Sequence, residues 1–401
     1  MNINLCNGRQ HLFIVAHLLI FVCADVLAQE EKKDSDDATV PSWRYEFQKK
    51  YELFRDYGYD GRLGSLFTLT PEDGLLIAAG PILYHFGFRT FPYVYRMELV
   101  GGLSIPTGRF KILYNVFWPS ISEHISLELK TMASELEVRN FYGFGNDNPR
   151  DEAMEETDFY RVSSREYSAR PMVRYSITKK SLVAVGVGIK NFKVREKSDR
   201  FLNSANLPLL GNDRTLGSVG IVVTIDTRDH ATAPHSGFYF SAGAWNSVEI
   251  LDDHSPFQRI VGELRAYVGD TLVTDLMLAL RFSGEKVEGR FPFFEAAYLG
   301  GTRSLRGYPA QRFAGDAAAF GSVELRFSVG RWKLIVPTEV GLFVLGDAGR
   351  VWLEGESPGK LHANAGGGLW LAPVNRDALI SFAAAASSEG LFVSGGIGFG
   401  F

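Results

Sequence analysis

Three arginines stand close together in the stretch GGTRSLRGYPAQRF, residues 300–313, and they are the clearest candidates for chemistry in the chain. A guanidinium is a permanently charged donor whose fork matches a carboxylate. An arginine drawn out of bulk water needs such partners to offset its desolvation. Ion pairing, rather than bond making, is the chemistry that these residues suit.

Motifs of catalysis are missing from the sequence. There is no G-x-S-x-G nucleophile elbow, no H-E-x-x-H zinc motif and no P-loop. The glycine clusters at 366–368 and 395–400 occur inside strand-like patterns, where glycine commonly allows close packing. A net charge of -4 shows no bias toward nucleic acid. We therefore expect no enzyme activity, no cofactor and no nucleic-acid partner.

Residues 1–28 have the pattern of a secretory signal peptide. Arg9 precedes an apolar run that ends at Cys23, and the pattern VLA at 26–28 is a small-residue cleavage site. The alternative, an N-terminal membrane anchor, is weaker because the run is short for a spanning helix. Both cysteines, Cys6 and Cys23, lie in this segment, so export would leave a chain without disulfides.

Residues 29–73 are interpreted as a short periplasmic N-terminal segment. Its charged part, 29–42, lacks apolar periodicity and is typical of a flexible leader. Aromatic residues then recur at helical spacing, which predicts a short amphipathic helix. These residues are Trp43, Phe47, Tyr51 and Phe54.

From residue 74 onward, apolar and polar residues alternate with the period of two that β-strands produce. In 320–330, for example, Val323 and Leu325 alternate with Glu324 and Arg326. Soluble sandwiches share this period, so alternation alone does not tell a lipid-facing surface from a protein core. Strands spaced roughly twenty residues apart make about sixteen over this length, which favours a closed outer-membrane barrel. We therefore predict an all-β, transmembrane, antiparallel β-barrel of about sixteen strands over 74–401.

Aromatic residues support this prediction. Outer-membrane barrels place aromatics at both membrane interfaces. Four tryptophans fall near predicted strand ends: Trp118, Trp245, Trp352 and Trp370. The last segment, GLFVSGGIGFGF, puts Leu391, Val393, Ile397, Phe399 and Phe401 on one face. It resembles the terminal signal strand of outer-membrane proteins, so we expect the bacterial outer membrane as the location and its lipid as a partner.

The arginine stretch lies in a long region without clean alternation, about 285–317, and five predicted strands follow it. This arrangement resembles the BamA/TamA-type surface-antigen family. The family's loop motif, V/L-R-G-F/Y, is matched by Leu305, Arg306, Gly307 and Tyr308. The resemblance implies a long loop between strands 11 and 12 that inserts into the barrel lumen.

The same resemblance implies partners for the loop arginine. Family members pair it with acidic residues on the inner wall, which correspond here to Glu324 and Asp347. In a lumen shielded from bulk water, two carboxylates would offset the desolvation of Arg306. Gly307 would permit a tight turn at the loop tip.

A second family motif, D-x-R…P-x-x-G, occurs in a turn between two strands. It is matched by Asp226, Arg228, Pro234 and Gly237. Metal-ligand types also occur in this stretch, namely Asp229, His230 and His235. No third imidazole or thiolate lies at ligand spacing, so the turn is the stronger interpretation and no metal site is predicted.

The resemblance covers about 58–401 and implies a role in inserting or translocating proteins, or lipids, at the outer membrane. Family members with such roles usually carry N-terminal POTRA domains, whereas 29–57 is too short for one, so the chain resembles the short subgroup without them. Outer-membrane or secreted proteins are the expected clients. Two alternatives stay open: a passive, porin-like channel, and a structural or anchoring barrel, including a homo-oligomer.

Overall fold

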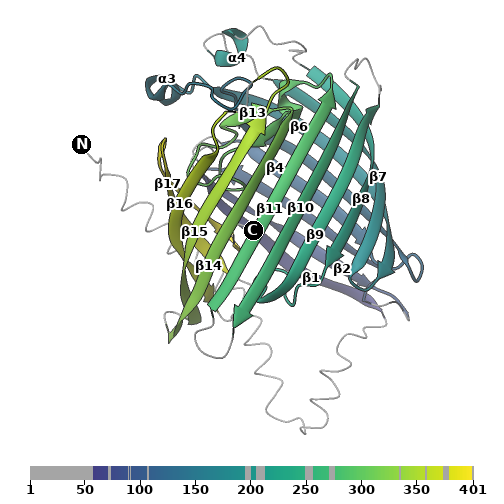
Figure 1. The fold of residues 1–401 in the computed structure, drawn as a ribbon. Helices are drawn as coiled ribbons and strands as arrows, with labels where there is room; N and C mark the ends of the chain where they lie inside the picture. The colour runs from purple at the N-terminus through teal and green to yellow at the C-terminus, as the bar shows by residue number, and fades with distance from the viewer. Residues whose placement is uncertain are drawn as a thin grey trace.

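The computed structural model describes residues 57–399 apart from 71–73, 89, 91, 106–107, 195–199, 205–212, 249–255, 271–275, 334–335, 357–358 and 374–378. Within them, β-strands form one large antiparallel sheet and one small separate sheet (Figure 1). The predicted all-β class is confirmed. The predicted signal peptide, the predicted helix that begins near Trp43, and Phe401 lie outside the described residues.

Strands of the large sheet are long. They are β1 (Gly58–Thr70), β2 (Gly74–Phe86), β3 (Tyr95–Ser104), β4 (Phe110–Trp118), β5 (Ile125–Asn140), β6 (Arg161–Thr178), β7 (Ser181–Val194), β8 (Asp213–Asp226), β9 (Ser236–Val248), β10 (Phe257–Asp270), β11 (Leu276–Gly289), β14 (Ala317–Lys333), β15 (Pro337–Trp352), β16 (His362–Pro373), β17 (Ile380–Ser387) and β18 (Gly390–Ile397). The short helices are α3 (Glu152–Glu156), α4 (Phe201–Ser204) and the 3-10 helix Phe293–Glu295. No helix in the described residues is long and apolar enough to cross a membrane.

Consecutive strands of the large sheet are hydrogen-bonded neighbours, except that β11 pairs directly with β14. The order returns to its start because β1 also pairs with β18, so the sheet closes into a barrel (Figure 1). This closing seam is short. It joins Thr68 to Gly396 and Leu69 to Gly395, whereas β17 and β18 pair along their full length.

The barrel is apolar outside and charged inside. On β14, Val323 is 42% exposed and Leu325 37% exposed, while the alternating Glu324 and Arg326 are 1% and 2% exposed. Successive side chains on a strand face opposite sides, so the charged pair points into the barrel. A water-soluble protein would lose the free energy of burying those leucines and valines, whereas a surrounding bilayer would cover them.

One boundary differs from the sequence prediction. The barrel begins at Gly58 with β1, so residues 58–70 belong to the sheet and not to a periplasmic segment that ends at 73. The alternation of β1 is weak, with glycines at 58, 61 and 64, and pairing along β2 supplies the order that the pattern lacks.

The connection between β11 and β14, residues 290–316, crosses the barrel interior and is called the inner loop below. It contains the 3-10 helix and a small hairpin of β12 (Ala297–Leu299) and β13 (Phe313–Gly315). Its aromatic side chains pack on the wall: Phe294 stacks on Phe192 of β7, with ring centroids 3.9 Å apart. These contacts form the largest apolar cluster of the described residues, so the inner loop replaces the side-chain core of a small barrel.

Two of the four tryptophans do not form an interfacial girdle. Trp370 is buried on the inner side of β16, and Trp245 on β9 lies under the Arg170 guanidinium, 4.6 Å from the ring centroid. Trp352, at the end of β15, is 41% exposed. Position near a strand end does not show whether a tryptophan points into or out of the barrel. In the structure, burial and a cation–π contact place these two tryptophans on the inner face.

Candidate functional site: an inner-loop arginine between two wall carboxylates

Arg306 lies in a tight turn of the inner loop. The backbone N–H of Tyr308 donates to the Leu305 carbonyl at 3.1 Å, and the N–H of Gly301 reaches the carbonyls of both residues. Gly301 has a φ of 83°, a backbone conformation that other L-residues rarely adopt. This turn aims the arginine away from its own loop and toward the wall.

The Arg306 guanidinium donates hydrogen bonds to both predicted carboxylates. Its Nε and Nη2 donate to Asp347 of β15 at 3.0 and 2.6 Å, and its Nη1 donates to Glu324 of β14. The backbone N–H of Arg306 also donates to Asp347, at 3.1 Å. All three side chains are at least nine-tenths buried. Burial alone would lower the pKa of Arg306, but hydrogen bonds and charge from Asp347 and Glu324 raise it, so the guanidinium stays charged.

Glu324 also binds a second arginine that the sequence analysis did not single out. Arg326, two residues along β14, donates from Nε to Glu324 Oε2 at 2.6 Å. The alternation of β14 had placed Arg326 on the same inner face, but sequence spacing alone did not show that it shares a carboxylate. The four side chains therefore form a charge-balanced set of two arginines and two acids.

Gly307 and Tyr308 hold the turn against β16 and β17. A Cβ at Gly307 would lie 2.5 Å from the Asn364 Cβ, so a larger residue would collide with the wall. Gly307 does not have a positive φ, so close approach, and not the expected turn conformation, requires glycine here. Tyr308 donates to the Ala363 carbonyl at 3.3 Å, and Asn364 donates to Asp347 at 2.9 Å.

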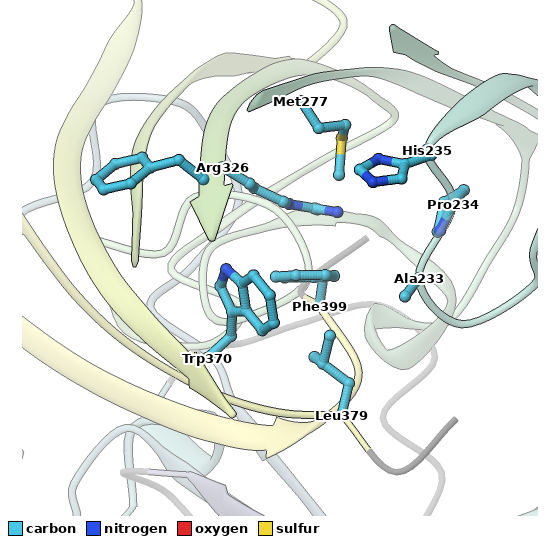
Figure 2. A pocket seen from close by; sticks show the side chains of 9 residues that line it. Ala233, Pro234, His235, Met277, Arg326, Trp370, Leu379 and Phe399 are labelled. Carbon is cyan, nitrogen blue, oxygen red and sulfur yellow. The ribbon is translucent and has the colours of Figure 1, made fainter. Parts of the chain in front are cut away.

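Phe399 corrects the expected terminal strand. β18 ends at Ile397, and Phe399 turns into the barrel instead of continuing the outward face with Leu391 (Figure 2). Its ring lies 3.6 Å from the Arg326 guanidinium carbon and packs edge-on against Trp370, with centroids 5.9 Å apart. A cation over a ring face is favourable when both are shielded from water, and this contact outweighs the continuation of the strand.

The D-x-R…P-x-x-G motif forms the expected turn, between β8 and β9. Arg228 donates to both oxygens of Asp226, at 2.9 and 2.8 Å, which raises the pKa of Arg228. Pro234 is buried, and Gly237 has a φ of 99° where a Cβ would lie 2.5 Å from the Thr227 carbonyl oxygen. The motif therefore forms a turn that packs beside Phe399.

Both histidines of this turn take part in hydrogen bonds that involve its backbone N–H groups. His230 Nδ1 accepts from the N–H groups of Thr232 and Ala233, and Asp229 accepts from the N–H of His235. In the described residues, no three His, Cys, Asp or Glu side chains are grouped to hold a metal ion. The turn interpretation of these metal-ligand types therefore agrees with their contacts.

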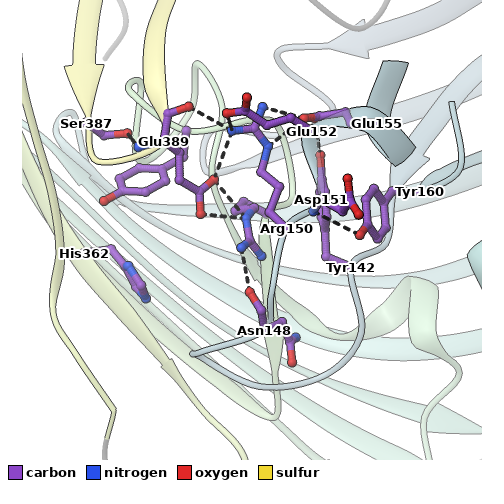
Figure 3. Close-up of polar contacts among 12 residues, drawn as sticks. Tyr142, Asn148, Arg150, Asp151, Glu152, Glu155, Tyr160, His362, Ser387 and Glu389 are labelled. Carbon is purple, nitrogen blue, oxygen red and sulfur yellow. Dashed lines mark hydrogen bonds and ion pairs between the residues drawn. The ribbon is translucent and has the colours of Figure 1, made fainter. Parts of the chain in front are cut away.

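A second charged network, which the sequence analysis missed, clamps the turn between β17 and β18 (Figure 3). Glu389 in that turn accepts from Arg312 Nε, at 2.9 Å to each carboxylate oxygen. Arg150, just before α3, donates to the Glu389 carbonyl at 2.8 Å and pairs with Glu155. No sequence period links these residues, because they come from three separate connections.

Chemically, the site is an electrostatic brace. Its members are permanently charged or hydrogen-bonded groups that join the inner loop to β14, β15 and β16. Such an arrangement positions the inner loop relative to the wall.

Comparison with known proteins agrees with this geometry. Residues 114–394, more than half of the chain, match the model of the Omp85 superfamily domain. No sequence among curated proteins matches the chain.

Solved structures with a similar fold include two proteins of the same family. BamA from Haemophilus ducreyi lacking POTRA domains 1–3 superposes with a TM-score of 0.60 at 14% identity, over 84% of this chain and 70% of that one. CdiB from Escherichia coli superposes with a TM-score of 0.57 at 14% identity, over 86% of this chain and 64% of that one.

Members of this family are outer-membrane β-barrels of Gram-negative bacteria, and both structural neighbours share the barrel fold. The resemblance that the loop motif indicated is confirmed. On the family match and the shared barrel, the chain belongs to the Omp85 superfamily.

Proposed function

We propose that this chain is a non-enzymatic outer-membrane barrel that helps proteins, or lipids, insert into or cross the outer membrane through the seam between β1 and β18. Sixteen strands would span the membrane, with the inner loop in the lumen. Outer-membrane or secreted proteins would be the clients. The proposal rests on one observation, the two-residue pairing that closes the sheet.

The seam is the weakest strand pair of the sheet. A backbone hydrogen bond contributes about 0.5–1.5 kcal/mol, so pairing over Thr68–Gly396 and Leu69–Gly395 alone is easier to open than the long β17–β18 pairing. Glycine adds no side-chain packing to the edge, and a Cβ placed at Gly396 would meet no atom within 4 Å. The opened edges would expose unpaired N–H and C=O groups that another strand can bind.

Photo-crosslinking at the seam tests this proposal. A photo-reactive residue at Gly396 fits the open space there, and one at Val323, exposed on the outer face of β14, is the matched control. We expect adducts with nascent outer-membrane or secreted proteins at 396 and not at 323. Adducts only within the chain, between the first and last strands, would contradict a working seam.

A passive channel is the second candidate. A cavity of about 630 Å³ in the barrel interior favours it, lined by Arg170, Lys190 and Trp245 among others. The inner loop opposes it, because its aromatic cluster packs across the lumen. Planar-bilayer recordings separate the two functions: steady conductance in the absence of any client would favour the channel.

A further inference from the structure

A second interior cavity, of about 460 Å³, lies between the inner loop and the β8–β9 turn. Four arginines line it: Arg228 from the turn, Arg265 from β10, Arg281 from β11 and Arg303 from the inner loop. Gly398 and Phe399 form another part of its wall. Neither family motif includes Arg265, Arg281 or Arg303.

Positive charge exceeds negative charge around this cavity. Arg228 takes both oxygens of Asp226. Arg265 and Arg281 share a single oxygen, Oε1 of Glu263, at 2.9 and 2.6 Å.

Arg303 completes the excess. It is exposed toward the cavity, and no carboxylate of the described residues lies within ion-pair distance of its guanidinium. Arg281 Nη1 donates to the backbone carbonyl of Arg303 at 2.9 Å, so this hydrogen bond joins the inner loop to β11 at the cavity. Four guanidiniums therefore face two carboxylates.

The neighbouring brace does not cancel this excess. Glu324 and Asp347 are already balanced by Arg306 and Arg326. Side chains of Arg228 and Arg281 are largely shielded from solvent, so water screens their charge poorly. The two uncompensated charges are one of the pair Arg265 and Arg281, which share Glu263, and the exposed Arg303. Two such charges at one cavity favour a bound anion.

We propose that this cavity binds an anion that carries a phosphate group. A phosphate monoester carries about -1.5 to -2 charges at neutral pH, which matches the excess, and its oxygens accept forked donation from several guanidiniums at once. A single carboxylate would neutralise only half of the excess. This binding site goes beyond the proposed seam function and does not depend on it.

Binding of inorganic pyrophosphate to the purified full chain in nanodiscs tests the site. Isothermal titration calorimetry should show binding that Arg303→Gln weakens about tenfold or more, as expected for the loss of one charge-assisted contact. Arg331→Gln is the matched control, because Arg331 is an 81% exposed arginine on β14 that does not line the cavity. Equal weakening by both variants, or none by Arg303→Gln, would overturn the proposal.

A second variant removes the question of folding. Arg303→Lys keeps the charge without the fork and should bind pyrophosphate more tightly than Arg303→Gln, with the same heat-modifiable mobility as the unaltered chain. Equal affinity of the two variants would show that charge at this position plays no part, and would overturn the proposal.

Two sources can supply the phosphate, and the lipid composition of the nanodisc distinguishes them. If a lipid headgroup occupies the cavity, phosphatidic acid in the nanodisc should weaken pyrophosphate binding to the unaltered chain and not to Arg303→Gln. If the ligand is a soluble phosphate compound, both lipid compositions should give the same affinity. Stronger competition by a glutamate-rich peptide than by inorganic phosphate would overturn the phosphate assignment.

Discussion

At the scale of residues, Arg306 shows why a charge can be buried at a barrel centre. Its guanidinium has lost bulk water, and Glu324 and Asp347 supply the compensating charge. Removing the arginine would leave Asp347 without its cation, while Glu324 would keep only Arg326, in the same shielded place. A broken buried ion pair is costly because the remaining charge has no partner, even where the intact pair adds little net stability.

We therefore expect Arg306→Ala to lower the free energy of unfolding by about 3–5 kcal/mol, the range for one removed partner of a buried pair. Urea unfolding and heat-modifiable gel mobility measure this loss. The exposed Arg331→Ala should change little. Unaltered mobility and protein level in the Arg306→Ala variant would contradict the brace.

Glu295 of the inner loop gives a prediction for pH. Burial alone would raise its pKa, but Lys190 and Arg259, at 2.8 and 2.7 Å, lower it from 4.5 to about 2. A depressed carboxyl pKa adds stability above the unfolded pKa, and that stability is lost as the pH falls through the folded pKa.

The Glu295→Gln variant should therefore have a lower free energy of unfolding than the unaltered chain, and this difference should be largest at neutral pH. The difference should shrink as the pH falls from about 4.5 toward 2. Urea midpoints measured across this range check the sign. A constant difference at all pH values would mean that the Glu295 charge is not the cause.

At the scale of elements, β18, the last strand of the seam, is held near both of its ends by contacts from elsewhere in the chain. Its turn with β17 is clamped by Arg312 and Arg150 through Glu389. Beyond its other end, Phe399 packs under Arg326. β18 therefore depends on the inner loop and on the β14 wall as well as on its two neighbours in the sheet.

Glu389→Gln removes the charge that both arginines share at the turn. We expect the backbone amides of 390–394 to exchange with deuterium about tenfold faster, as the loss of about 1.4 kcal/mol from charged hydrogen bonds implies. Glu288→Gln is the control, since Glu288 is an exposed carboxylate paired at 3.6 Å with Lys286. Equal exchange in all three proteins would show that the clamp does not stabilise β18.

At the scale of the whole molecule, an outward apolar surface and an inward charged network require a closed wall, and the seam is the shortest pairing in that wall. Because both cysteines lie at positions 6 and 23, a disulfide introduced into the barrel would have no competing thiol within it. A covalent bond across the seam would therefore distinguish a function that requires β1 and β18 to separate from a function that does not.

Thr68→Cys with Gly396→Cys places a disulfide across paired residues, where Cα atoms lie within bridging range. We expect the oxidised variant to lose client adducts and client delivery, and reduction to restore them. Gly262→Cys with Gly284→Cys, a paired position of β10 and β11, is the control that should leave delivery unchanged. Full delivery with the seam bridged would contradict passage through it.

Much of this protein could be predicted from its sequence. The alternation of strands such as β14 determined the all-β class and the charged inner face, because a strand repeats its facing every two residues. The turn motif brought Asp226 close to Arg228, a contact that is local in the chain. The partners of Arg306, 18 and 41 residues away, were implied by the family resemblance and not by any local pattern.

Only the tertiary structure decided the rest. It turned Phe399 inward, required glycine at 307 through the approach of Asn364, and gave Glu324 a second arginine. It also brought four arginines from four separate elements to one cavity. Each of these depends on the distance between residues far apart in the chain, which the closure of the barrel sets and no sequence period contains.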